Sequence, residues 1–303
     1  MKYALIGCGR IAVNHIKAVL NNQLELVAVC DILPEKMEAL LAKYDLQNDA
    51  SIARYTDYKK LLSEHPELQL ISIATESGLH AEIALEAGRF GRLSHGSIHV
   101  RWNRDHSYYD QASWRGTWAQ DGGCLMNQCI HGIDLLRWML GDEVDEVYGA
   151  TRRQFHDYLE AEDVGLAVVK FKNGAIGTIE GTTNVYPKNL EETLYVFGEK
   201  GTVKLGGTST NNIDVWNFAD ESDADAKNKG LQEATSNVYG NGHTSLFADM
   251  VDAIEHDRKP YVDAVAGRNA LEMVLAIYKS QKTGLPVKLP LTDFASTDMT
   301  GEF

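Results

Sequence analysis

The sequence predicts two domains: an N-terminal α/β domain on a parallel, doubly wound sheet, and a C-terminal α+β domain on an open, mostly antiparallel sheet. Through residues 1–88, apolar runs alternate with helical periodicity, as is typical of strands covered by helices on both faces. From residue 93 onward, apolar and polar residues alternate, which is the period of half-buried strands. The chain has 303 residues, 44% of them hydrophobic, which is enough for two cores. We therefore expect domains at 1–88 and 89–303.

The first strand, turn and helix carry a dinucleotide-binding pattern. The N-terminal MKYALIGCGRIAVNH places a short apolar strand before two glycines and apolar residues at helical spacing after them. In this G-x-G-x-x-A pattern Gly7 permits a tight turn, Gly9 lets the backbone approach a pyrophosphate, and Ala12 lets the helix pack closely. We expect the loop, with Arg10 and Ile11, to bind the cofactor at the start of the helix. The alternative is a turn whose glycines are only structural.

Asp31 ends the second predicted strand and stands 22 positions after Gly9, close to the separation expected of an acid that binds both ribose hydroxyls. Its carboxylate would repel a 2′-phosphate, and no arginine follows it directly, so the sequence favours NAD over NADP. The remaining elements of an apparently shortened, right-handed Rossmann-type sheet are helices at 34–44 and 55–64, a strand at 68–74 and a helix at 80–87.

The second domain alternates short strands with turn signals. Strands are predicted at 97–102, 144–153, 164–172, 175–183, 192–197, 202–205 and 287–291, and helices at 121–138, 245–256 and 263–283. Asn173 and Gly174 indicate a tight hairpin, and Gly284 ends the last helix. Segments 206–212 and 219–229 are predicted to be solvated loops.

An aperiodic stretch from 103 to 123 mixes arginines with aromatic residues. Such a mixture suits a sugar ring and an anionic group, so the candidate substrate-binding residues are Arg104, Tyr109, Trp114 and Arg115. The alternative is a packed surface loop anchored by its tryptophans. In the amphipathic helix expected after this stretch, Asn127, His131 and Asp134 share one face by their i, i+4 and i, i+3 spacing.

Composition limits the partners of the chain. Its net charge of −14 argues against nucleic acid and against an anionic membrane surface, and no apolar stretch reaches 18 residues. Cys8 and Cys30 stand beside glycines or in a buried strand, and Cys124 and Cys129 do not form a common zinc pattern with His131. We expect a cytoplasmic protein without disulfides or a metal site.

Several motifs resemble those of the Gfo/Idh/MocA oxidoreductases, which are two-domain, nicotinamide-dependent sugar dehydrogenases. The resemblance rests on IGCGRIA, Asp31, IATESGLHAEIALEAG, the 121–138 segment and GRNALEMVLAIYKSQKTG. It implies that the loop of Thr75, Ser77 and His80 borders the nicotinamide, although helix capping would also explain these residues singly. WRGTW and NQ-x-IH-x-ID are similar to a sugar-nucleotide subgroup, the UDP-N-acetylglucosaminuronate 3-dehydrogenases.

The resemblance also implies roles in the second domain. His131 is the substrate-side acid or base, a task that suits an imidazole. Asn127, in a position where the family often has aspartate, would hold the sugar. Asp134 would orient or bind the substrate, and His243 falls where relatives sometimes contact it. The open face of the second sheet would form a homo-oligomer, a dimer or a tetramer.

The sequence departs from the family pattern at Gly88. The usual Glu-Lys-Pro, whose lysine transfers the proton, occurs nowhere in the chain, and about 50 to 60 residues, roughly two strand–helix units, are missing from the pattern. Natural shortening, an engineered deletion and an incomplete sequence all stay open. Loss of such an electrostatic group predicts a rate lower by about a hundredfold or more. The alternative function is a non-catalytic, shortened member that binds sugar or assists assembly.

Overall fold

The computed structural model describes the chain except residues 10–11, 74–87, 142, 221–249 and 261. The chain divides into two compact units. The N-terminal unit is built mainly on Met1–Arg89, and the C-terminal unit mainly on Phe90–Ala219 and Val262–Phe303.

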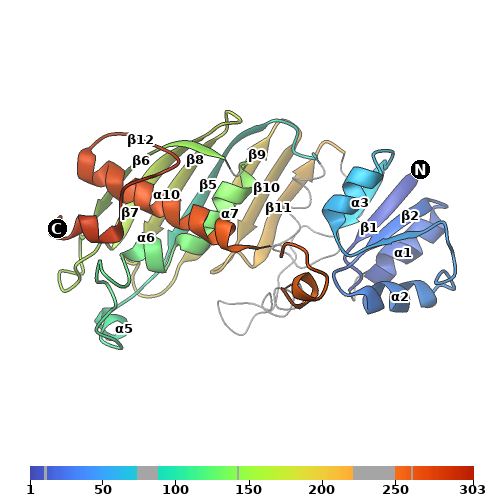
Figure 1. Cartoon of the computed structure of the whole chain (residues 1–303), viewed down its shortest axis with the longest axis horizontal. Coiled ribbons are helices and arrows are strands. Elements are labelled where there is room, and N and C mark those ends of the chain that lie inside the picture. Colours follow the sequence, from blue (N-terminus) through green and yellow to red (C-terminus); the bar gives the residue numbers. More distant parts are fainter. Residues whose placement is uncertain (10–11, 74–87, 142, 221–249, 261) are drawn as a thin grey trace. The chain divides into compact units, whose positions relative to one another are not determined.

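The N-terminal unit contains a four-stranded parallel sheet in the order β3-β2-β1-β4; Figure 1 labels its central strands, β1 and β2. Its strands are β1 (Lys2–Ile6), β2 (Glu25–Cys30), β3 (Ala53–Tyr55) and β4 (Leu70–Ile73), and its helices are α1 (Ala12–Asn21), α2 (Pro34–Ala42) and α3 (Tyr58–Glu64). Nearly every residue of β1 and β2 is buried, as expected of a parallel sheet covered on both faces. Because β1 lies between β2 and β4, the turns that follow β1 and β2 meet at the carboxyl edge of the sheet.

One hydrophobic cluster joins α1 and α2 to the sheet. Ile16 and Val19 of α1 and Leu41 of α2 pack with Leu5 of β1 and Val29 of β2, and all are almost completely buried. This packing fixes where α1 begins relative to the end of β1. The unit therefore holds its glycine turn on rigid elements.

The C-terminal unit contains an eight-stranded sheet in the order β11-β10-β9-β5-β8-β7-β6-β12. The strands are β5 (Leu93–Arg101), β6 (Val144–Arg152), β7 (Val164–Phe171), β8 (Ile176–Thr182), β9 (Glu191–Gly198), β10 (Gly201–Gly206), β11 (Asn212–Phe218) and β12 (Val287–Lys288). Only β5 and β8 pair in parallel; the other neighbours in this sheet are antiparallel. The predicted open, mostly antiparallel sheet is confirmed.

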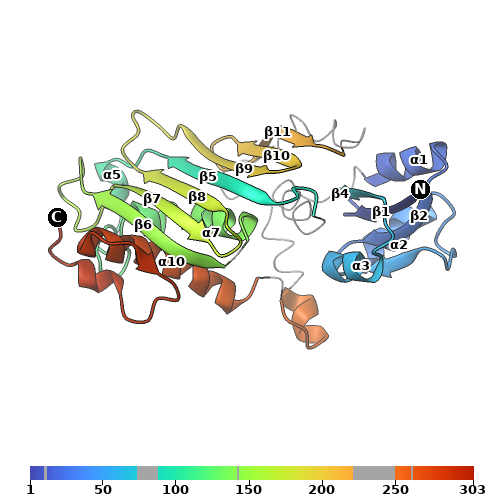
Figure 2. The ribbon, with the colours of Figure 1, turned by 90° about the horizontal axis from the view of Figure 1, so that it is seen from above.

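Three helices of this unit pack on one face of that sheet, where α10 runs across the strands beside α7 (Figures 1 and 2). They are α6 (Cys124–Asn127), α7 (Ile130–Met139) and α10 (Ala264–Thr283). The short helix α5 (His106–Tyr109) precedes them in the sequence, and the 3-10 helix η1 (Ser296–Met299) follows. Buried and exposed residues alternate along the strands accordingly: in β7, Ala167, Val169 and Phe171 are buried. Gly284 ends α10 in the left-handed conformation, with φ of 68°, as the sequence predicts.

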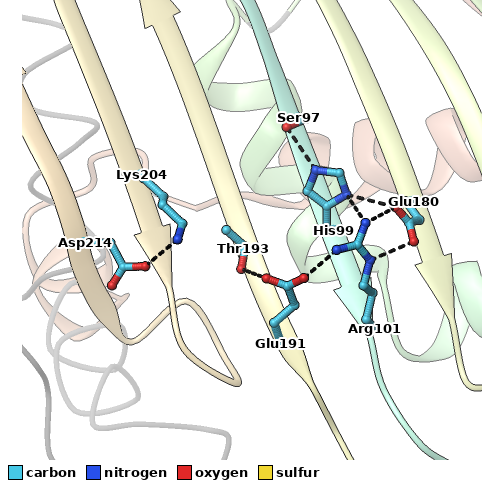
Figure 3. A network of polar contacts seen from close by, with 8 residues as sticks. All are labelled: Ser97, His99, Arg101, Glu180, Glu191, Thr193, Lys204 and Asp214. Atoms are coloured by element: carbon cyan, nitrogen blue, oxygen red, sulfur yellow. Dashed lines mark hydrogen bonds and ion pairs between the residues drawn. The ribbon is translucent and has the colours of Figure 1, made fainter. Parts of the chain in front are cut away.

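The opposite face carries exposed apolar residues and a network of ion pairs (Figure 3). Arg101 bridges Glu180, at 2.5 and 2.7 Å, and Glu191, at 2.5 Å, while Nδ1 of His99 lies 3.1 Å from Glu180 (Figure 3). Beside this network, Leu166, Val168 and Ile176 are about half exposed. This face therefore combines paired charges with an uncovered apolar area.

Several sequence predictions need correction. The single helix expected at 121–138 is divided into α6 and α7, because the N–H of Cys129 bonds to the carbonyl of Cys124, five residues back, and shifts the helical phase. β3 and β11 are strands that the sequence did not predict, and Tyr55, where a helix was expected to begin, lies in β3. Among the described residues, no helix combines the length and apolarity needed to cross a bilayer. Of the helix predicted at 245–256, only residues from 250 onward are described, and 250–255 are helical.

Candidate functional site

The glycine turn of the N-terminal unit has the geometry that a bound dinucleotide needs. Gly7 adopts φ of 94°, which favours glycine, and its N–H bonds to the carbonyl of Cys30 at 2.7 Å. A Cβ atom on Gly9 would meet nothing within 4 Å, so the backbone is open on that side. The N–H of Ala12 bonds to Gly9, and α1 begins there with no acidic residue in its first turn. A pyrophosphate can therefore approach the start of α1 without like-charge repulsion from that turn.

Asp31 joins this turn to the end of β2. Its Oδ2 accepts a hydrogen bond from the N–H of Cys8 at 2.7 Å, and its Oδ1 accepts one from the N–H of Leu33 at 3.0 Å. Each carboxylate oxygen keeps further acceptor capacity, so the ribose hydroxyls can still bind to a carboxylate whose orientation is fixed. These residues fit an NAD-type dinucleotide.

The first turn of α6 is anchored by a buried carboxyl group. Oε1 of Glu162 accepts hydrogen bonds from the N–H of Leu125 and the hydroxyl of Tyr278, both at 2.9 Å. Tyr278 in turn accepts from the N–H of Gly123 at 3.2 Å. Burial raises the pKa of Glu162 to about 8. Since a Cβ on Gly123 would lie 1.6 Å from Oε2 of Glu162, this turn requires glycine there.

Both the oxygen and the nitrogen of the Asn127 side-chain amide form hydrogen bonds. Its Oδ1 accepts from the hydroxyl of Tyr108 at 3.3 Å and from Nε2 of Gln128, and its Nδ2 donates to Oδ1 of Asp121. Gln128 also donates to the Tyr108 hydroxyl at 2.8 Å. Because Nδ2 carries two protons and Asp121 takes one, Asn127 keeps one donor for a ligand.

His131 and Asp134 lie in the first turns of α7. The imidazole of His131 is exposed, and the described residues give it no hydrogen-bond partner. Asp134 is half-buried and accepts from Nε and Nη2 of the buried Arg137 at 3.1 and 2.9 Å. The structure therefore leaves the imidazole accessible and commits the carboxylate largely to Arg137.

The predicted arginines and aromatic residues gather around Tyr108. Cζ of Arg115 lies 4.1 Å from the centre of its ring and Cζ of Arg104 lies 5.0 Å from it. Trp114 is 39% exposed and lies beneath the Arg115 guanidinium, at 4.9 Å. Tyr109 instead packs inward, and its hydroxyl bonds to Thr183 at 3.4 Å.

A small recess brings part of this set together. It is lined by Tyr109, Gly116, Asp121, Gly122, Gly123, Cys124, Asn127, Gln128, Leu159 and Glu162. Tyr108, Gln128 and Asp121 were not among the sequence candidates. The available signals were that Tyr108 and Asp121 lie in the aperiodic stretch from 103 to 123 and that Gln128 follows Asn127 directly. Their role depends on side-chain contacts that spacing alone does not predict.

Several predicted residues lie outside the described part of the chain, namely Arg10, Ile11, Thr75, Ser77, His80 and His243. The four cysteines are free and buried. Within the described ranges, no three His, Cys, Asp or Glu side chains gather as a group that could hold a metal ion.

Comparison with known proteins identifies the family of both parts of the chain. The model of an oxidoreductase family with an NAD-binding Rossmann fold matches residues 1–93, and the model of the GFO/IDH/MocA C-terminal domain matches residues 79–204. The WlbA dehydrogenase from Bordetella pertussis, whose structure holds NADH and UDP-GlcNAcA, is 31% identical. Its superposition covers 96% of this chain and 98% of that one, with a TM-score of 0.63.

More distant relatives include a myo-inositol 2-dehydrogenase from Thermotoga maritima, 21% identical over 67% of this chain and 74% of that protein. The uncharacterized oxidoreductase YrbE from Bacillus subtilis is also 21% identical, over 95% of this chain and 96% of its own length. That alignment runs over 342 positions, more than the 303 residues of this chain, so YrbE contains residues without a counterpart here. The chain belongs to the Gfo/Idh/MocA family of NAD-binding oxidoreductases.

Proposed function

We propose that this protein is an NAD-dependent dehydrogenase that acts on a secondary alcohol of a sugar nucleotide. The observation that carries the proposal is the similarity, over nearly the whole chain, to a WlbA dehydrogenase crystallised with NADH and UDP-GlcNAcA. The non-catalytic alternative is not favoured, because the glycine turn, Asp31 and an accessible His131 are all retained. We also propose that the first domain ends at residue 88 and the second begins at residue 89.

Gly7, Gly9 and Asp31 would hold the dinucleotide, with the backbone of the turn at the pyrophosphate and the carboxylate at the ribose. NAD, when bound, accepts or returns the hydride. Arg10, Ile11, Thr75, Ser77 and His80 are proposed as further cofactor contacts.

The residues of α6 and α7 would handle the substrate. The accessible imidazole of His131 would take the hydroxyl proton as the alcohol is oxidised and give it back in reverse. Asn127 would use its remaining Nδ2 proton to hold a sugar oxygen in place. Asp134 is proposed to position the first turns of α7 through Arg137, and Tyr109, Trp114 and His243 to contact the sugar.

The chain performs this chemistry without the lysine of a Glu-Lys-Pro motif. We place the residues that YrbE has in excess after Gly88, where this chain departs from the family pattern. Proton transfer then rests on His131 alone, and turnover is expected to be about a hundredfold slower than with a cation beside the developing alkoxide.

The test is turnover of UDP-N-acetylglucosaminuronate by the purified protein, followed by the absorbance of NADH. We expect slow formation of NADH that falls by about a hundredfold in His131→Ala. The matched control is His256→Ala, which removes another exposed imidazole in the N-terminal unit. Absence of NADH with the wild type despite NAD binding would overturn the proposal.

The open face of the large sheet is proposed to join two copies of the chain into a dimer, or into a tetramer by a further contact. Support comes from Tyr148, Leu166, Val168 and Ile176, which are 44 to 54% exposed on neighbouring strands. The neighbouring carboxylates of Glu180 and Glu191 are already paired with Arg101, which lowers the cost of removing them from water. We also propose a cytoplasmic location, in keeping with four free thiols.

A further inference from the structure

Two guanidinium groups lie over one aromatic ring in the C-terminal unit. Arg115 and Arg104 both lie over Tyr108, at 4.1 and 5.0 Å, and Arg104 also lies 5.0 Å from the ring of Trp102. Aromatic faces stabilise cations without neutralising them. Both positive charges are thus held beside the same tyrosine.

Neither cation has an acidic partner of its own. Among the described residues, no carboxylate forms an ion pair with Arg104 or Arg115, in a chain whose net charge is −14. The charge of Arg115 acts to lower the pKa of Asp121, against the larger effect of burial. The oxygens of Asp121 already accept hydrogen bonds from the N–H of Gly116 and from Asn127. The Nε atoms of both arginines are buried without a hydrogen-bond partner. Buried donors without acceptors are costly, so this arrangement suits a ligand that brings oxygen atoms.

The arginines stand between the candidate sugar position and an open recess. On one side, the Tyr108 hydroxyl donates to Asn127 at 3.3 Å. On the other side, Nη1 of Arg104 donates to Oδ1 of Asn189 at 3.1 Å. Asn189 lines the recess together with Asn103, Pro187, Lys188 and Thr208. The contacts therefore run from the amide of Asn127 through Tyr108 and Arg104 to the recess.

We propose that Arg104 and Arg115 bind the diphosphate of the sugar nucleotide, and that the recess at Lys188 and Asn189 receives its nucleoside. This inference rests on the proposed function, because it assumes that the sugar lies at Asn127. The order of sugar, diphosphate and nucleoside in such a substrate matches the order of the three features. Guanidinium groups match phosphate oxygens in geometry as well as in charge.

The test is calorimetric binding of UDP to the full chain, without NAD and without turnover. We expect UDP to bind and its affinity to fall about tenfold in Arg104→Gln and in Arg115→Gln. Arg92→Gln is the matched control, because it removes the same charge from a side chain that is 89% exposed. Lys188→Gln, at an exposed position, should weaken UDP binding without affecting folding.

Inorganic pyrophosphate and glucuronate separate the two anionic groups that such a substrate carries. Pyrophosphate should compete with UDP, and glucuronate should bind equally to wild type and variants. If the variants lose glucuronate but keep UDP, the arginines hold the sugar carboxylate and the inference is wrong. UDP affinity that is equal in wild type, Lys188→Gln and both arginine variants would also overturn it. Because UDP binding needs no hydride transfer, failure of the dehydrogenase assay would leave this result standing.

Discussion

Nδ2 of Asn127 donates a hydrogen bond to Oδ1 of Asp121, and this contact ties the end of α6 to the loop that precedes it. Oδ2 of Asp121 accepts from the N–H of Gly116 at 2.6 Å, and burial raises the pKa of this carboxyl group. A second carboxylate at position 127 would face Asp121 with no donor between them. An amide at position 127 avoids this repulsion and supplies the donor.

Asn127→Asp is therefore expected to destabilise the protein by about 2 kcal/mol near neutral pH. Repulsion raises the folded-state pKa of the pair above its unfolded value, so the cost is small in acid and grows as pH rises. Thermal unfolding at about pH 5 and about pH 8 measures the difference. Asn48→Asp, in an exposed loop, supplies the control. An equal loss of Tm at both pH values would contradict the role of Asp121.

Two glycine substitutions should have opposite effects. Gly123→Ala places a methyl group against Oε2 of Glu162 in a buried site, and we expect a loss of about 3 kcal/mol or more. Gly267→Ala lies in α10, where the new Cβ meets nothing within 4 Å, and should gain about 0.5 to 1 kcal/mol. Denaturant unfolding of both variants measures this. Similar midpoints would rule out the close approach of Glu162 to the turn.

Glu162 should make the protein less stable as pH rises. Burial raises its pKa from 4.5 to about 8, so between these values the unfolded chain releases a proton that the folded protein retains. Stability then falls across this window, and Glu162→Gln should flatten the fall. Unfolding free energies across the window, with the exposed Glu35→Gln as control, give the measurement. If the unfolding free energy of Glu162→Gln falls with pH as steeply as that of the wild type, Glu162 does not cause the fall.

Asp31 should decide the choice of dinucleotide. Asp31→Ala removes the acceptor for the ribose hydroxyls, and we expect NAD to bind about tenfold more weakly while binding of NADP is unchanged or improved. Calorimetric titration measures both affinities, and the exposed Asp45→Ala controls for charge. Because Asp31 also accepts from Cys8 and Leu33, Tm is recorded beside each titration. Failure of the wild type to bind NAD would instead support the non-catalytic alternative.

The oligomer proposal predicts that a charge on the open sheet face separates the copies. Leu166→Lys, at a position that is 54% exposed, should shift the sedimentation coefficient to that of a monomer. Leu20→Lys, on α1 and 42% exposed, should leave it unchanged. A wild type that already sediments as a monomer at micromolar concentration would exclude this interface.

The sequence predicted features that are encoded locally. Gly7, Gly9 and Asp31 follow two apolar strands at fixed spacing, so the parallel sheet and its turn could be inferred without tertiary information. The division between α6 and α7 could not be inferred in this way. Cys129 packs so closely against β8 that a Cβ atom on Gly181 would lie 2.7 Å from its sulfur. That neighbour is set by the sheet, not by the helical period.

β11 was missed for a related reason. The register of β10 and β11 shifts between Lys204 and Leu205, so buried Ile213 and Trp216 are three positions apart and break the alternation that indicates a strand. In the site, Tyr108 contributes through its ring and hydroxyl to partners far apart in the sequence. The residue types could be predicted there, and their pairing could not.

β5 enters the eight-stranded sheet first in the sequence and ends in its middle, between β8 and β9. Those neighbours begin only at Ile176 and Glu191, and such distant pairing slows folding. During synthesis, β5 leaves the ribosome with both edges unpaired, and the edge that pairs with β9 stays unpaired until the chain has passed Gly198. Unpaired edges of this kind attract other strands, so the nascent chain at this stage depends most on protection from aggregation.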